Sequence, residues 1–252
     1  MTGKLSRAKP KPLALTIAGS DSSGGAGLQA DLATFLALGV DGASVITAIT
    51  AQTPKMVLGI DPVKPAVVLK QLEAVFANRK PKAVKTGMLF SAGVVECVAE
   101  FFGGRKRSPL VVDPVMVSSS GTELLRPGGM RALKKKLLPI ATVVAPNVPE
   151  AEELAGIEIR EPEDMRVAAR SLFEHYGCAA VVTGGHLPGR EVIEIFYDGR
   201  EELLLTVPRI KGGPWHGTGC RFTAAIVVEL GKGRKLAQAV VKAKEHVANW
   251  IA

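Results

Sequence analysis

Residues Gly212 to Leu230 have the sequence GGPWHGTGCRFTAAIVVEL, which joins a glycine-rich loop to an apolar segment with helical spacing. The first N–H groups of a helix have no partner within the helix, so a loop of this kind can hold an anion. Taken alone, the stretch favours the simpler interpretation, a helix N-terminus with turn glycines and a buried cysteine. An anion site becomes the better interpretation only if other polar loops lie beside it.

Cys220 stands at the expected start of that helix, where the positive end of the helix dipole lowers the pKa of a thiol. We therefore expect Cys220 to be a base within one turn of an anion cradle. Cys97 and Cys178 lie in or beside helical segments without such a loop, so packing is their expected role. The three cysteines form no CxxC pair, and neither a disulfide framework nor a zinc site is indicated.

The composition indicates a globular protein with a sizeable core, because 47% of the 252 residues are hydrophobic and 22% are charged. No apolar run reaches the ~18 residues that a membrane span requires, so we expect no membrane partner and a cytoplasmic location. Residues 1–12 are basic and are expected to form a flexible leader. The net charge is +8, but aromatic residues are only 5% and do not interleave with the basic clusters, so no nucleic-acid partner is expected.

Short apolar strands alternate with amphipathic helices along residues 13–252. A strand is expected at Leu13 to Ala18, a strand break at Ala51 to Pro54, and a basic helix at Met130 to Leu138. No internal repeat or linker divides the chain. The pattern predicts a single α/β domain over residues 13–252, with a mostly parallel sheet covered by helices on both faces.

Polar or glycine-rich segments follow the expected strands, and in open α/β sheets ligands bind outside the carboxyl ends of the strands. These segments are Gly19 to Asp21, Gln52, Gly87-Met88, Asp113, Asn147, Thr183 to Gly185 and the Gly217 loop. Seven such exits predict a crevice along one edge of the sheet.

Several nucleotide-binding and hydrolytic motifs are excluded. There is no Gly-Lys-Ser/Thr segment of a P-loop and no G-x-S-x-G nucleophile elbow. Gly25 to Ala30 fits G-x-G-x-x-A, but it does not follow its strand directly. Gln52 stands where a dinucleotide fold needs an acid for the ribose, so we expect no dehydrogenase.

Seven segments occur in a fixed order along nearly the whole chain. They are LTIAGSDSSGGAGLQADL (Leu15 to Leu32), SVITAITAQTP (Ser44 to Pro54), KTGML (Lys85 to Leu89), VVDPVMVSSSG (Val111 to Gly121), APNVPEAEEL (Ala145 to Leu154), GGH (Gly184 to His186) and HGTGC (His216 to Cys220). This set resembles the hydroxymethylpyrimidine/phosphomethylpyrimidine kinases of thiamine biosynthesis, a branch of the ribokinase-like superfamily. The resemblance implies a three-layer α/β/α fold, ATP and Mg²⁺ as cofactors, a small-molecule pyrimidine substrate and a homodimer.

The resemblance also implies a role for each matching residue. Gly217, Thr218 and Gly219 would hold the γ-phosphate oxygens, and Cys220 would deprotonate the substrate hydroxymethyl group. Gly19, Ala26, Gln52 and Met88 would form the pyrimidine pocket, with the Gln52 carboxamide reading the pyrimidine edge. Asp113, Asn147, Glu150, Thr183 and Gly185 would bind the nucleotide, and Asp113 and Glu150 would face magnesium. Asn147 and Glu150 also suit a helix N-cap with a first-turn acid, and both interpretations can hold together.

Two positions depart from the family pattern. Thr183 stands where a lysine usually precedes Gly-Gly-His, and Arg221 stands where a small hydroxyl residue usually follows the cysteine. Arg221 could restore the missing charge by turning towards the phosphates, or it could face solvent. Trp215 is expected to form a wall of the nucleotide site. For His216 we expect a structural hydrogen bond rather than the role of base.

Two alternatives to the pyrimidine kinase stay open. One is a pyridoxal or pyridoxine kinase, because that substrate is also a hydroxymethyl heterocycle. The other is a pyrimidine-binding sensor without transfer activity, which the changes at Thr183 and Arg221 motivate. The intact Cys220 and Gly-Thr-Gly segment argue against the sensor, since binding alone needs no base.

Overall fold

A nine-stranded sheet in the order β3-β2-β1-β4-β5-β6-β7-β8-β9 forms the centre of the computed structural model, which describes residues 10–53, 55–104, 108–210 and 216–252. The strands from β2 through β7 in this order pair in parallel. Antiparallel pairing adds β3 at one side of the sheet and β8 followed by β9 at the other. The strands are β1 (Leu13–Asp21), β2 (Asp41–Gln52), β3 (Val57–Pro62), β4 (Ala83–Thr86), β5 (Leu110–Val112), β6 (Val143–Val144), β7 (Ala179–Thr183), β8 (Glu191–Tyr197) and β9 (Glu202–Pro208).

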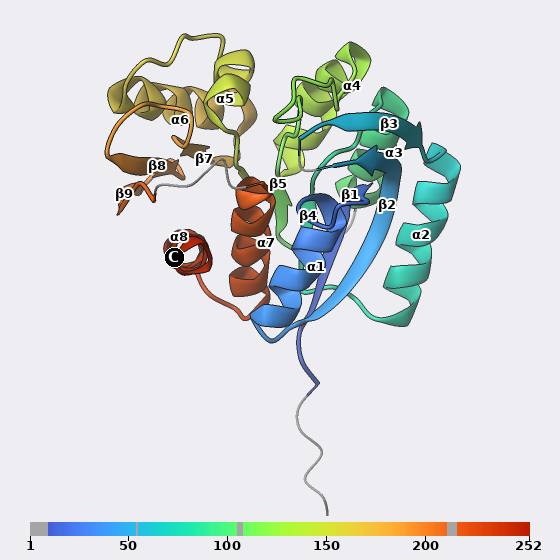
Figure 1. Ribbon diagram of the computed structural model, residues 1–252. Helices are drawn as coiled ribbons and strands as arrows, with labels where there is room; N and C mark the ends of the chain where they lie inside the picture. The colour runs from blue at the N-terminus through green and yellow to red at the C-terminus, as the bar shows by residue number, and fades with distance from the viewer. Residues whose placement is uncertain (1–9, 54, 105–107, 211–215) are drawn as a thin grey trace, which may run out of the picture.

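Helices cover both faces of the sheet (Figure 1). One face carries α1 (Gly27–Ala37), α7 (Thr218–Gly231) and α8 (Leu236–Ile251). The other carries α2 (Pro65–Asn78), α3 (Ala92–Gly103), α4 (Pro127–Ala132), α5 (Val148–Ala155) and α6 (Pro162–Tyr176). The predicted three-layer α/β fold with a mostly parallel sheet is confirmed.

Side chains of the central strands alternate between the two layers of core. In β5, Leu110 and Val112 pack towards α2 to α6, whereas Val111 packs towards α1, α7 and α8. All three are buried, which is why this strand is apolar throughout rather than alternating. The carboxyl ends of the parallel strands form one edge of the sheet, and the loops that follow these strands lie together along that carboxyl edge.

Two expected elements differ in the structure. Ala51 and Gln52 still belong to β2, so the expected break begins only at Thr53, and the missed edge strand β3 then pairs back on β2. The expected helix at Met130 to Leu138 begins earlier, since Pro127 suits a first helical turn. It then continues as a π-helical turn (Leu133–Leu137) and a 3₁₀ turn (Leu138–Ile140). β1 also runs past Ala18 to Asp21, so Gly19 lies within the strand.

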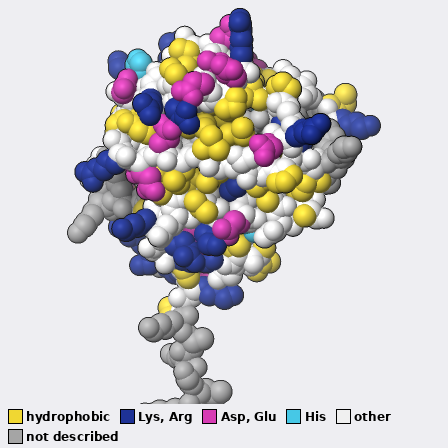
Figure 2. Space-filling view, turned by 90° about the vertical axis from the view of Figure 1, so that its left-hand side faces the viewer, with side chains coloured by type: hydrophobic (Ala, Val, Ile, Leu, Met, Phe, Trp, Pro, Cys, Tyr) yellow, Lys and Arg dark blue, Asp and Glu magenta, His cyan; other side chains and the backbone are white. Residues whose placement is uncertain are grey.

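The surface on the side of β9, α6 and α8 carries basic, acidic and apolar side chains intermixed (Figure 2). The net charge is therefore not gathered into a single basic stripe on this face. None of the helices in the described ranges is long and apolar enough to cross a membrane. Residues 1–9 of the expected leader lie outside the described residues.

Candidate active site

The anion loop packs against the segment that begins α1. Gly217 is the N-cap of α7 and has φ +84°, a left-handed conformation that glycine adopts easily. A Cβ at Gly217 would overlap the carbonyl oxygen of Gly25. Ala26 is the N-cap of α1, so the starts of two helices lie side by side at this edge of the sheet. Thr218 and Gly219 form the first turn of α7, whose N–H groups are available to an anion.

Cys220 lies in that same turn and is partly buried. Burial raises the pKa of its thiol to about 12, and the charges of Asp113 and Asp31 add to this rise. The Lys85 ammonium and a hydrogen bond from the Gly27 N–H act in the opposite direction but do not cancel it. The expectation of a lowered pKa is therefore wrong for the ligand-free protein, because loss of hydration outweighs the helix dipole.

Asp113 follows β5 and is buried next to one ammonium group and one hydroxyl group. Thr223 Oγ1 donates to Asp113 Oδ2 at 3.0 Å, and the Lys85 ammonium lies 3.5 Å from the same oxygen. The described residues make no hydrogen bond to Asp113 Oδ1. One carboxylate oxygen is thus held in place, and the other is left as an acceptor.

Asn147 and Glu150 form a capping box at the start of α5. The Asn147 side chain accepts from the Glu150 N–H at 3.0 Å, and Glu150 Oε2 accepts from the Asn147 N–H at 3.0 Å. The other oxygen, Oε1, accepts from the Met116 N–H at 3.3 Å. Burial raises the pKa of Glu150 to about 8, and the charge of Asp113 contributes to the rise. Asp113 and Glu150 are thus close enough for their charges to oppose each other.

The residues expected at the pyrimidine pocket lie together at the ends of β1, β2 and β4. A Cβ at Gly19 would lie 2.9 Å from Met88 Sδ, so the glycine makes room for that side chain. The Gln52 amide lies 3.3 Å from His216 Nε2, and this nitrogen lies 3.2 Å from Asp21 Oδ2. Asp21 Oδ2 also accepts from the Ala26 N–H at 2.8 Å. His216 thus connects the expected pyrimidine reader with the start of α1.

Thr183 and Gly185 lie at the exit of β7, beside α5. Thr183 forms an isolated parallel bridge with Asn147, which brings the two expected nucleotide positions together. Gly185 lies in a loop whose carbonyl groups converge on Arg209, a residue that the sequence pattern did not indicate. The Arg209 guanidinium donates to Gly185, Leu187 and Gly189 at 2.6 to 3.0 Å.

We predict that Arg209→Ala loosens this loop and raises the KM for ATP by about 10-fold, because charged hydrogen bonds to three carbonyls are lost. The kcat should change by less than about 3-fold, since Arg209 does not contact the anion loop. Steady-state kinetics at varied ATP concentration measure both values. An unchanged KM would show that the loop does not contribute to nucleotide binding.

Arg221 adopts neither of the two expected positions. Its guanidinium carbon lies 4.1 Å from the centre of the Trp250 ring, in a cation–π contact with α8. The Arg221 side chain is thus bound by the last helix and does not replace the charge missing at Thr183. Trp215 lies outside the described residues.

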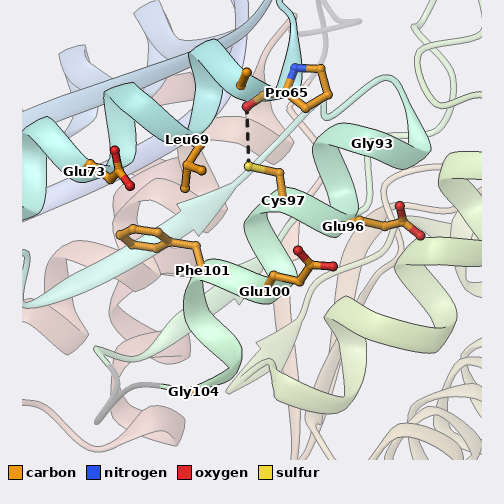
Figure 3. Close-up of a pocket in the computed structure, with 10 residues that line it drawn as sticks. Pro65, Leu69, Glu73, Gly93, Glu96, Cys97, Glu100, Phe101 and Gly104 are labelled. Atoms are coloured by element: carbon orange, nitrogen blue, oxygen red, sulfur yellow. Dashed lines mark hydrogen bonds between the residues drawn. The ribbon is translucent and has the colours of Figure 1, made fainter.

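A surface groove between α2 and α3 is separate from this edge of the sheet (Figure 3). Pro65, Leu69 and Glu73 line it from α2, and Cys97 and Glu100 line it from α3. The Cys97 thiol donates to the Pro65 carbonyl at 3.5 Å, as Figure 3 shows. No residue of the expected site lines the groove, so it is not the crevice that the sequence predicts.

Known kinases share both the sequence and the fold. Residues 21–252 match the family model described as phosphomethylpyrimidine kinase. A hydroxymethylpyrimidine/phosphomethylpyrimidine kinase from Rhizobium meliloti is 46% identical, with 93% of this chain and 88% of that protein covered. The bifunctional thiamine biosynthesis protein ThiED of Geobacter sulfurreducens is 44% identical, but the match of 96% of this chain spans only 49% of its length.

Two solved structures resemble this chain closely. Phosphomethylpyrimidine kinase from Clostridium difficile superposes with a TM-score of 0.85 at 39% identity, covering 96% of this chain and all 100% of that chain. Pyridoxal kinase from Staphylococcus aureus in complex with pyridoxal superposes with a TM-score of 0.88 at 36% identity, covering 96% and 88%.

The α/β/α fold, with an anion loop and buried carboxylates at the carboxyl edge of a parallel sheet, defines a kinase of small molecules. The family-model match covers most of the chain and is more specific than the fold. The chain belongs to the phosphomethylpyrimidine kinase family.

Proposed function

We propose that the protein transfers phosphate from ATP to 4-amino-5-hydroxymethyl-2-methylpyrimidine and then to its monophosphate, in thiamine biosynthesis. The observation that carries the proposal is the arrangement of Gln52 and Met88 at the sheet edge next to the anion loop. Gln52 offers a donor and an acceptor to the aminopyrimidine edge, and the Met88 side chain packs directly over Gly19. The relatives named for this activity support it.

The transfer site would use three sets of residues. The N–H groups of Gly217, Thr218 and Gly219 would hold the oxygens of the transferred phosphoryl group, where charge develops. Cys220 would accept the proton of the hydroxymethyl group. Because its pKa is raised in the ligand-free protein, a small fraction of strongly basic thiolate would act. The Arg221 guanidinium would stay stacked on Trp250 of α8, and Asn147, Thr183 and Gly185 would flank the nucleotide.

Magnesium fits the carboxylates of this site. Asp113 leaves Oδ1 as an acceptor, and Glu150 has a pKa raised to about 8 by burial and by the charge of Asp113, a repulsion that a cation would relieve. The described residues contain no group of three or more His, Cys, Asp or Glu side chains that could hold a metal. The two carboxylates of Asp113 and Glu150 still suit Mg²⁺, which needs few carboxylates and takes its other ligands from phosphates and water. When bound, Mg²⁺ would neutralise phosphate charge.

A side-by-side assay tests the proposed substrate. We expect the hydroxymethylpyrimidine to be phosphorylated with a higher kcat/KM than pyridoxal, with consumption of ATP coupled to each product. Faster turnover of pyridoxal would favour the pyridoxal kinase, as the Staphylococcus aureus structure suggests. Binding of the pyrimidine without any ATP consumption would favour the sensor.

We also propose a cytoplasmic homodimer. The edge formed by β2 and β3 exposes Ile49 (55%), Met56 (51%) and Leu58 (69%), which a second copy could cover. Cys97, Cys178 and Cys220 are all free thiols, which suits a reducing compartment. Light scattering tests the dimer, and a mass near the 26.5 kDa of a single chain would contradict it.

Glu150 gives the metal-free protein a predicted pH dependence. Its folded pKa of about 8 lies above its ordinary value of 4.5, so the folded protein binds more protons between these values. Stability from this group is therefore complete below about pH 4.5 and is lost as the pH rises through 8. In EDTA, the Tm of Glu150→Gln should gain about 5 to 10 °C relative to wild type between pH 5 and pH 8.5. Thermal melts across that range check this, and a constant difference would contradict it.

A further inference from the structure

Lys85 is the centre of a buried ionic cluster next to the anion loop. Its ammonium donates to Asp31 Oδ1 at 2.6 Å and lies 3.5 Å from Asp113 Oδ2, and both Lys85 and Asp31 are fully buried. A Cβ at Gly87 would lie 3.7 Å from Lys85 Nζ, so the charge lies at the carboxyl end of β4 rather than in the middle of the sheet. A buried lysine is costly unless it is paired, so its position needs a reason.

Asp31 is the closer of the two carboxylates that pair with Lys85. Asp31 is itself held on its other oxygen by Thr16 Oγ1 at 2.6 Å, which makes it a fixed anchor within the core. The second contact, to Asp113, is longer at 3.5 Å. It links the core to a carboxylate that borders the crevice.

Asp113 is held from two sides by this arrangement. Lys85 approaches Oδ2 from β4, and Thr223 Oγ1 donates to the same oxygen from α7. Thr223 also contacts the Gly219 carbonyl at 2.9 Å, within the first turn of α7. Any shift of Lys85 would therefore move Asp113 relative to the anion loop.

The charges around Cys220 come from the same cluster. The Lys85 ammonium lowers the pKa of the Cys220 thiol, whereas burial and the carboxylates of Asp113 and Asp31 raise it. The neighbouring Arg221 guanidinium is stacked on α8. Among the described residues, Lys85 is thus the buried cation that faces both Asp113 and Cys220.

We propose that Lys85 is a positioning residue for phosphate transfer: anchored on Asp31, its ammonium fixes the Asp113 carboxylate and presents a positive charge to the first turn of α7. This assignment rests on the proposed function for its kinetic consequence. The arrangement itself is independent of which hydroxymethyl compound is phosphorylated.

The experiment compares Asp31→Asn with Asp31→Asn/Lys85→Met, which differ only at Lys85 and leave no buried carboxylate at position 31. We expect the single variant to lose about 10-fold in kcat, because Lys85 keeps its charge and its contact with Asp113 but loses its anchor. The double variant should lose about 100-fold in kcat, with the KM for the hydroxymethyl substrate changed by less than about 3-fold.

A second readout uses nucleotide-free protein and needs no turnover. Iodoacetamide alkylation of Cys220, located by mass spectrometry, should be faster in Asp31→Asn than in wild type, because a negative charge is removed. It should be about 10-fold slower in the double variant than in the single variant. If the pyrimidine were not a substrate, the proposed function would fail while the alkylation result still decided the role of Lys85.

Glu229→Gln is the matched control. Glu229 is a buried carboxylate at the far end of α7 and is paired with Lys232 and Arg234. The Glu229→Gln substitution should lower the Tm without changing kcat or the alkylation of Cys220. A folded double variant that matches the single variant in both readouts would overturn the proposal. If the double variant did not fold, a kcat of Asp31→Asn equal to that of wild type would overturn the proposal, because Lys85 would not need its anchor.

Discussion

Cys220→Ser is expected to fold normally and to lower kcat about 1,000-fold, in the middle of the range that general-base catalysis contributes. A serine hydroxyl is far harder to ionise than a thiol, even one whose pKa burial raises to about 12. The substitution is nearly isosteric, so the Tm should fall by no more than about 4 °C. Single-turnover transfer with saturating ATP and substrate measures the effect.

The wild-type protein should also show a characteristic pH profile. Below the raised pKa the thiolate fraction of Cys220 increases about 10-fold for each pH unit, so the rate of transfer should rise with pH in the alkaline range. Cys97→Ser is the control, because Cys97 lies in the groove between α2 and α3, where its thiol donates to the Pro65 carbonyl, and no residue of the expected site lines that groove. Unchanged turnover in Cys220→Ser would show that Cys220 is not the base.

Gly217→Ala is expected to lower kcat by at least about 100-fold and to reduce the Tm as well. The added Cβ would overlap the Gly25 carbonyl oxygen, and the backbone angle φ of +84° is strained for alanine. The loop must therefore move away from the start of α1. A displacement of about 1 Å is enough for a loss of this size when donors must match a transition state.

Gly39→Ala separates the backbone strain from the overlap. Gly39 has a similar φ of +77°, but a Cβ there would meet nothing within 4 Å, and it lies between α1 and β2, away from the crevice. It should cost about 1–2 kcal/mol of stability and leave kcat unchanged. If Gly217→Ala behaved like Gly39→Ala, the anion loop would not need its present packing.

The layers of the fold could be predicted from the sequence, because a strand covered by helices on both faces is apolar at every position, as Leu110 to Val112 are. The edge strand β3 could not be predicted. It exposes Leu58 and pairs only with β2, so neither burial nor alternation marks it. The π-helical turn after α4 was missed because its residues keep an ordinary helical pattern.

The places of Asp113, directly after β5, and Gln52, the last residue of β2, could be predicted because each comes at the end of an apolar strand. The ion pairs and hydrogen bonds that set the charge and the pKa values of these residues join positions distant in sequence. Lys85 and Asp31 are 54 positions apart, and nothing in the local pattern shows that they pair. The pKa of Cys220 was predicted with the wrong sign because the helix position is visible in the sequence, whereas burial is not.

The contacts of His216 have a thermodynamic consequence. A pyrimidine bound to Gln52 as proposed would compete with His216, which also contacts Asp21 and directly precedes the glycine of the anion loop. Occupancy at one end of the crevice would then be linked to the conformation at the other. Such coupling is reciprocal, so whatever factor the bound pyrimidine adds to the affinity for a phosphate, the phosphate adds to the affinity for the pyrimidine.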